Sequence, residues 1–140
     1  MHTIVLDTNV FVAALRSGGG ASRQMLRAVL QGRYQPLFGN ALWLEYEDLL
    51  GRGEVWTPQT TAAERQQVLA ALAQAGRWIT PYFGWRPNLR DEGDNHLIEL
   101  AIAGGASAIV THNLRDLRHG ELSWKHLRVL TPAQCLETLP

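Results

Sequence analysis

The sequence of 140 residues contains one cysteine, Cys135, and one lysine. A single cysteine cannot form an intrachain disulfide, and such low cysteine usage fits the reducing cytoplasm. No apolar stretch approaches about 18 residues, so we expect no membrane-spanning helix. The N-terminus lacks a basic segment followed by a long apolar run, and we therefore expect no signal peptide. Together these absences favour a cytoplasmic protein with no membrane partner.

The sequence has no excess of charge of either sign, because 13 basic residues balance 13 acidic ones. A protein with zero net charge is not drawn to nucleic acid by its overall electrostatic field. Twelve of the basic residues are nonetheless arginine. This bias has two interpretations, a codon preference of the source genome or phosphate recognition by the planar guanidinium group. Composition alone does not decide between them.

Two common kinds of ligand site are also missing. No histidine and cysteine residues have the spacing of a zinc site, and no GxxxxGK[ST] segment is present, which argues against a nucleotide triphosphatase. The glycine-rich segment at residues 17–20 lacks the lysine and is interpreted as a flexible loop. A chain of this length can bury a core of its own without a disulfide or a metal. We predict a single domain over residues 1–140.

Short apolar segments alternate with helical ones along the chain. The predicted strands are residues 3–6, 34–38, 108–111 and 127–130, with a short strand or extended connection at 78–83. The predicted helices are residues 10–15, 22–31, 40–50, 61–75 and 91–103, and a last short helix after residue 131. Alternating strands and helices are typical of an α/β fold with a parallel sheet covered on both faces.

The ends of several predicted helices carry recognisable signals. Ser22 and Asn40 are predicted to cap their helices, because short polar side chains accept hydrogen bonds from the first free N–H groups. Thr61 and Thr131 are each followed three residues later by Glu or Gln, which predicts capping boxes. Pro36 lacks an N–H group, which would be awkward in a central strand but is tolerable at an edge of the sheet.

Polar side chains follow two of the predicted strands. Asp7, Thr8 and Asn9 come directly after the first strand, and the segment 111–116 follows a later one. In open parallel sheets, ligands bind beyond the carboxyl ends of the strands, so both segments are expected at the same edge. Asp7 is therefore a candidate wall of a site. The alternative is a surface turn residue that caps the next helix.

Two predicted helices carry further acids. Glu45 lies nearer to the apolar stripe of its helix than Glu47 or Asp48 does, and we expect it to face inward; the alternative is a partly exposed helix charge. Asp91 and Asp94 share one face at the start of another helix, where capping explains one acid more easily than two. Carboxylates held close together retain a proton or bind a cation, and oxygen ligands suit Mg²⁺ or Mn²⁺.

Four segments together resemble a known family: IVLDTNVFVAAL, LWLEYEDLL, DEGDNHLIELAIAGGASAIVT and THNLRDL. Their order and spacing are similar to those of PIN-domain proteins, and most similar to small bacterial VapC-like toxin components of toxin–antitoxin systems. The resemblance implies a three-layer α/β/α fold around a central parallel sheet. It also implies an endoribonuclease that depends on Mg²⁺ or Mn²⁺ and forms no covalent intermediate.

The resemblance also implies roles for individual residues. The acids carried over by position as catalytic and metal-binding are Asp7, Glu45, Asp94 and Asp116, with Asp91 as an additional metal ligand. The neutral polar supports are Asn9, Thr111 and Asn113, and the candidate substrate contacts are Arg86 and Arg115. Some family members carry an aspartate where this chain has Asn113, so the position of a second metal stays open. His112 is expected in a loop or against the substrate.

The partners implied by the resemblance are an RNA substrate, a second copy in a homodimer and a small antitoxin. In this hypothesis a metal ion activates water for attack on the phosphodiester, which leaves 5′-phosphate and 3′-hydroxyl ends. One alternative is a PIN fold without turnover that binds RNA or protein. Another is a phosphatase with Asp7 as nucleophile, although Asn9 stands where such enzymes usually carry a second aspartate. Trp85 is a candidate for base stacking, with a place in the core or at an interface as the alternative. Trp43 and Trp56 are candidates for a partner interface or for the core.

Overall fold

The computed structural model describes residues 1–80, 95–114 and 127–140. The strands are β1 (His2–Leu6), β2 (Tyr34–Phe38), β3 (Arg77–Trp78), β4 (Ala108–Val110) and β5 (Arg128–Leu130). The α-helices are α1 (Thr8–Arg16), α2 (Ala21–Leu30), α3 (Asn40–Leu50), α4 (Ala62–Ala75), α5 (Asn95–Gly104) and α7 (Pro132–Thr138), with a 3-10 helix η1 (Gly53–Val55). All neighbouring strands are parallel, and their order is β3-β2-β1-β4-β5.

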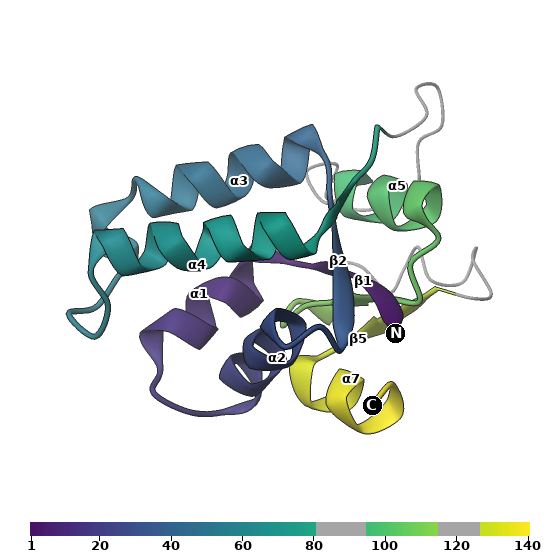
Figure 1. Ribbon diagram of the computed structural model, residues 1–140, viewed down its shortest axis with the longest axis horizontal. Coiled ribbons are helices and arrows are strands. Elements are labelled where there is room, and N and C mark those ends of the chain that lie inside the picture. The colour runs from purple at the N-terminus through teal and green to yellow at the C-terminus, as the bar shows by residue number, and fades with distance from the viewer. Residues whose placement is uncertain (81–94, 115–126) are drawn as a thin grey trace.

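Helices cover both faces of this sheet. Helix α5 packs against β1, β2 and β4, whereas α2 packs on β2 and contacts α7, which lies against β4 and β5. Figure 1 shows α5 on the opposite side of the strands from α2 and α7, with α3 and α4 running side by side. This arrangement confirms the predicted three-layer α/β/α fold. In the described part of the chain, no helix has the length and apolar character needed to cross a bilayer.

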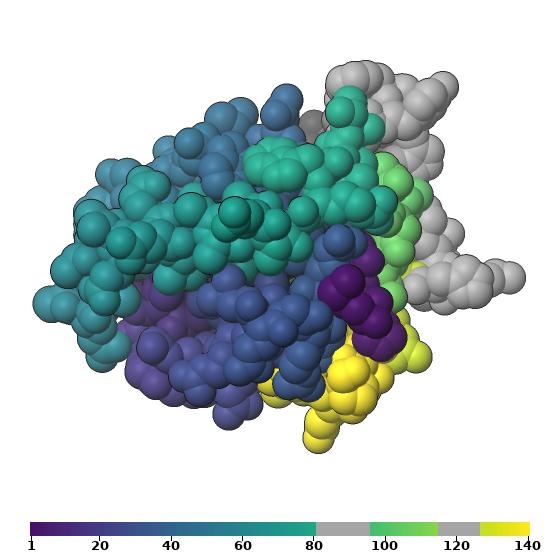
Figure 2. All heavy atoms as spheres, in the orientation of Figure 1, coloured from purple at the N-terminus to yellow at the C-terminus, as the bar shows by residue number. Residues whose placement is uncertain are grey.

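The central strands are buried on both faces because helices lie above and below them. All residues from Ile4 to Leu6 and from Ala108 to Val110 are buried, without the alternation of a half-exposed strand. The C-terminus returns to the amino end of the sheet, where the Tyr34 hydroxyl donates to the Leu139 carbonyl. Figure 2 shows the purple N-terminal residues and the yellow C-terminal helix on this same part of the surface. Residues 7–9 and 111–113 follow the ends of β1 and β4 and lie at the opposite, carboxyl edge of the sheet.

The predicted helix caps are partly confirmed. Both capping boxes are present, at Thr61 and Thr131. The prediction that Ser22 caps α2 is wrong, because α2 begins one residue earlier and Gly20 occupies the capping position. The prediction that Asn40 caps α3 is also wrong, because Asn40 is the first residue of the helix and its N-cap is a glycine. Neither of these two helices has a side-chain hydrogen bond at its N-cap.

Strand β2 lies inside the sheet, between β3 and β1, where a proline is awkward. Strand β3 has two residues and pairs only with Leu37 and Phe38, whereas Pro36 pairs with Ile4 of β1. At Pro36 the strand is therefore locally an edge, where a missing N–H group is tolerated.

Two tryptophans considered for a partner interface pack within the domain. Trp43 lies edge-on against Phe38, with 5.7 Å between ring centroids. Trp56 donates its indole N–H to the carbonyl oxygen of Leu49 at 2.9 Å and lies edge-on against Phe11. Both side chains are half-buried. Packing inside the domain accounts for both rings, so they do not require a partner.

The packing of α5 on β2 depends on a glycine. A Cβ atom at Gly104 would overlap Cδ1 of Leu37 and lie 3.1 Å from its Cδ2, and Leu37 is fully buried. We expect Gly104→Ala to lower the free energy of unfolding by about 1–3 kcal/mol, measured by urea denaturation. Gly53→Ala is the matched control, because a Cβ atom at Gly53 meets nothing within 4 Å. Equal stability of the two variants would contradict this tight contact.

Candidate functional site

Asp7 stands where β1 ends and α1 begins. Its backbone N–H donates to the Val110 carbonyl at 2.9 Å, which continues the pairing of β1 with β4. Its Oδ1 accepts the N–H of Thr8 at 2.8 Å and caps α1, which explains why this helix begins two residues earlier than predicted. The residue is only 8% exposed. Asp7 therefore caps a helix, as the alternative interpretation expected, but it is buried rather than on the surface and lies at the carboxyl edge of the sheet.

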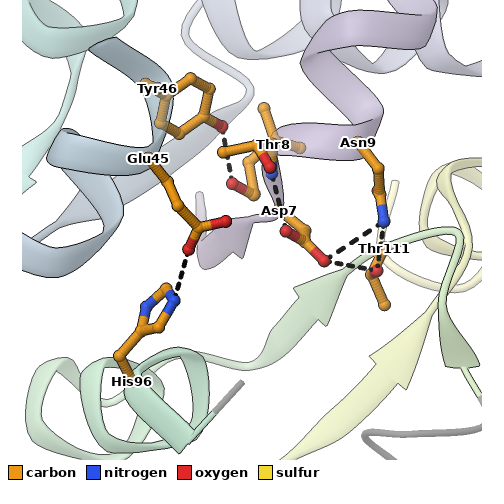
Figure 3. A network of polar contacts seen from close by, with 8 residues as sticks. Asp7, Thr8, Asn9, Glu45, Tyr46, His96 and Thr111 are labelled. Atoms are coloured by element: carbon orange, nitrogen blue, oxygen red, sulfur yellow. Dashed lines mark hydrogen bonds and ion pairs between the residues drawn. The ribbon is translucent and has the colours of Figure 1, made fainter. Parts of the chain in front are cut away.

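A network of donors surrounds the second oxygen of Asp7 (Figure 3). Oδ2 accepts from the Thr111 hydroxyl at 2.8 Å and from Nδ2 of Asn9 at 3.3 Å. The Thr111 oxygen accepts from Nδ2 of Asn9 at 3.1 Å and from the N–H of Asn113 at 3.0 Å, so its one proton is free to point to Asp7. The N–H of His112 donates to Oδ1 of Asn9 at 3.1 Å and fixes the orientation of that amide. The network presents donors alone to Oδ2, as an ionised carboxylate requires.

The electrostatic environment of Asp7 works against this ionised form. Burial raises the pKa of Asp7 above its ordinary value, and the negative charge of Glu45 adds to this effect. The hydrogen bonds from Thr111 and Thr8 and the nearby His96 act in the opposite direction without cancelling it. A buried carboxylate near a second acid is a position where a bound cation would relieve both desolvation and repulsion.

The side chains of Glu45 and His96 are in contact at the rim of this site. Oε2 of Glu45 on α3 lies 2.5 Å from Nε2 of His96 on α5. The Glu45 side chain is 46% exposed, so it is more open to solvent than the inward orientation predicted, whereas His96 is 20% exposed. Figure 3 shows the Glu45 carboxyl group between His96 and Asp7. His96 was not among the predicted residues, and its position after the acidic segment gave no signal that it meets Glu45.

Tyr46 fixes the helix that carries Glu45. Its hydroxyl donates to the Leu6 carbonyl at 2.6 Å, and its ring lies edge-on against Phe11 with centroids 5.2 Å apart. Burial raises the pKa of Tyr46 well above its ordinary value, so the phenol stays protonated and remains a donor. Leu6 is the residue before Asp7. This hydrogen bond thus ties α3 to the end of β1 and fixes the position of Glu45 relative to Asp7.

A second tertiary hydrogen bond supports the segment after β4. Oγ of Ser22, in the first turn of α2, lies 2.7 Å from Nε2 of His112. Ser22 is buried, and its hydroxyl makes this contact rather than the predicted helix cap. Because the backbone of His112 also holds Asn9, this contact links α2 to the network around Asp7.

Several predicted site residues lie outside the described residues. They are Asp91, Asp94, Asp116, Arg86, Arg115 and Trp85. In the described ranges, no group of three or more His, Cys, Asp or Glu side chains is placed to hold a metal ion. Among the predicted site residues that are described, the structure brings together Asp7, Glu45, Asn9, Thr111 and the backbone of Asn113. Their carboxylate and hydroxyl oxygens are the donors that Mg²⁺ and Mn²⁺ prefer.

Comparison with known proteins identifies the family. The family model described as "PIN domain" matches residues 3–115, which include both described acids and Thr111. Comparison with curated proteins returned no match. PIN domains are in general nucleases, which agrees with oxygen-bearing side chains gathered at the carboxyl edge of the sheet. With most of its length matched, the chain belongs to the PIN-domain family.

Proposed function

We propose that this protein is an endoribonuclease that depends on Mg²⁺ or Mn²⁺ and acts as the toxin component of a toxin–antitoxin system. The observation that carries the enzymatic part is the buried Asp7 carboxylate, which faces donors on one side and the Glu45 charge on the other. The nuclease character of the family supports it. The toxin part, with its antitoxin and homodimer, rests on the sequence resemblance.

The donor set fits a hard divalent cation. Asp7 and Glu45 would hold it, together with the predicted ligands Asp91, Asp94 and Asp116. When bound, such a cation supplies Lewis acidity and lowers the pKa of coordinated water. Two carboxylates that repel each other without a cation favour its uptake.

The chain's own residues orient these acids. Hydrogen bonds from Thr111 and Asn9 fix the Asp7 carboxylate and restrict its rotation. His96 holds the Glu45 carboxylate at the rim and offsets part of its charge when protonated. An acid pair oriented in advance needs less reorganisation when substrate arrives, which is the usual origin of efficient electrostatic catalysis.

A groove offers a path for the RNA strand. A hollow of about 620 Å³ begins at Thr8 and Asn9, beside the acids, and continues along α1 to Arg16. The guanidinium group of Arg16 is suited to a phosphate contact. A single-stranded or looped RNA would reach the acids along this groove more easily than a rigid duplex.

The proposal is tested by the metal requirement and the products of cleavage. The purified protein is expected to cleave single-stranded RNA in Mn²⁺ or Mg²⁺ and to lose this activity in EDTA. The products should carry 5′-phosphate ends, detected by their digestion with a 5′-phosphate-dependent exonuclease. Products with 2′,3′-cyclic phosphates, or cleavage that persists in EDTA, would contradict a metal-dependent mechanism.

A further inference from the structure

A cavity of about 410 Å³ opens next to the acid pair, at the same edge of the sheet. It lies between the first turn of α3, the end of β3 and helix α5. Its volume falls within the range of about 300–1,000 Å³ that is usual for small-molecule sites. The residues that matter for its chemistry are Asn40, Trp78, Thr80, His96 and Glu99. The network around Asp7 does not use this cavity.

Trp78 gives the cavity a fixed aromatic surface. Its ring stacks on Phe38, with 5.4 Å between centroids and 25° between planes, and lies against Trp43 at 5.3 Å. Phe38 is buried in the core, so the stack is anchored, whereas Trp78 is 49% exposed. An exposed and immobilised indole ring is a platform for stacking of a nucleic-acid base.

Asn40 gives the cavity a polar group that suits the edge of a base. Such an edge offers amino and carbonyl groups. Asn40 is exposed at the first position of α3, and its amide can donate to and accept from such an edge.

The cavity is adjacent to the acids through a shared residue. His96 lines the cavity and also contacts the Glu45 carboxylate. A nucleotide whose phosphate is held by a cation at Asp7 and Glu45 would have the cavity beside it, on the side that His96 lines. We propose that this cavity is a subsite for one unpaired base of the RNA substrate, stacked on Trp78. This inference rests on the proposed ribonuclease function and specifies its substrate as single-stranded RNA.

The subsite is tested by RNA binding in the Asp7→Asn background, where cleavage is not expected to interfere. Binding of a fluorescein-labelled single-stranded oligoribonucleotide is measured by fluorescence anisotropy at constant salt. Adding Trp78→Leu is expected to weaken binding about tenfold, whereas Trp78→Phe retains most of the affinity, because phenylalanine can still stack. The matched control is Leu30→Ala, which changes a 42% exposed apolar residue on α2. Circular dichroism establishes that each variant is folded.

A second measurement separates stacking from indirect effects. One abasic position is moved along the oligonucleotide. At one position, the abasic site should weaken RNA binding by the protein that carries Trp78. It should have little further effect on RNA binding by the Trp78→Leu variant, because both changes remove the same contact. Additive losses at every position would overturn the proposal. So would a Trp78→Leu variant that changes oligomeric state in gel filtration but binds RNA normally, since this face would then be a protein interface.

These outcomes are distinguishable from a failure of the proposed function. If the protein with its native Asp7 cleaves RNA but Trp78→Leu binds RNA as tightly as its parent, the subsite is wrong and the ribonuclease proposal stands. If Trp78 governs RNA binding but no cleavage occurs in Mn²⁺, the subsite stands and the catalytic proposal is wrong.

Discussion

Asp7→Asn is expected to reduce Mn²⁺-dependent RNA cleavage by more than about 100-fold, because losing a residue that only hydrogen-bonds to a metal ligand already costs about 10–100-fold. The substitution removes the charge that would hold the cation and leaves the shape nearly unchanged. Its amide replaces one acceptor oxygen with a donor, which opposes the N–H of Thr8 or the Thr111 hydroxyl. This loss is offset by removing a buried charge whose pKa is raised. The fold should therefore persist.

Three measurements check this expectation: kcat/KM on a labelled RNA, Mn²⁺ binding by isothermal titration calorimetry and thermal unfolding by circular dichroism. The matched control is Asp48→Asn, since Asp48 is an exposed acid on α3 that pairs with Arg52 at 2.7 Å. The control should cleave RNA at the normal rate. Induced expression of the unchanged protein should arrest growth, and Asp7→Asn should not. Full cleavage by a folded Asp7→Asn variant would refute the assignment of this acid.

Thr111→Val is expected to reduce cleavage by about 10–100-fold, although it changes neither the charge nor the size of the site. The valine lacks the hydroxyl that donates to Asp7 and accepts from Asn9 and Asn113. Asp7 then keeps the hydrogen bonds from Thr8 and Asn9 but loses the shorter of the two side-chain bonds to Oδ2. The hydrogen bond from Thr111 lowers the Asp7 pKa, so its loss raises that pKa further. The carboxylate is then protonated at higher pH, and the acid side of the activity profile should shift to higher pH.

Thr111→Ser separates this role from packing, because serine keeps the hydroxyl and removes a methyl group. We expect Thr111→Ser to retain most of the activity, the Mn²⁺ affinity and the pH profile. Thr111 is fully buried, so both variants lose some stability, which thermal unfolding measures. A valine variant with an unchanged pH profile and unchanged Mn²⁺ affinity would mean that Thr111 serves packing alone.

The fold was predictable because its signals are local and repeated. The apolar runs of β1 and β4 are buried on both faces, as continuous runs without alternation indicate. The rule that ligands bind at the carboxyl ends of parallel strands then placed Asp7 and the segment from Thr111 onward together, and the 2.8 Å hydrogen bond between them agrees with it. The helix caps were less predictable where a tertiary contact competed, as at Ser22, whose hydroxyl binds His112.

The rim of the site was predicted less well because it depends on how helices pack. Helical periodicity placed Glu45 near the apolar stripe of α3, but its side chain contacts His96 of α5 and is 46% exposed. The same packing brings His96 to Glu45, and no pattern within either segment encodes that contact. The roles of Asp91, Asp94 and Asp116 stay predictions, since these residues lie outside the described ranges.

The proposed double use of Asp7, as a helix cap and a catalytic acid, restricts the evolutionary routes by which such a protein can become inactive. Asparagine, aspartate and serine are comparably good at a helix N-terminus, whereas alanine there costs roughly 0.5–2 kcal/mol. Drift toward a silent descendant should therefore favour asparagine or serine at this position, because both preserve the start of α1 while removing the negative charge. An inactive homologue would then keep the fold, and a single side chain at the end of its first strand would distinguish it from an active nuclease.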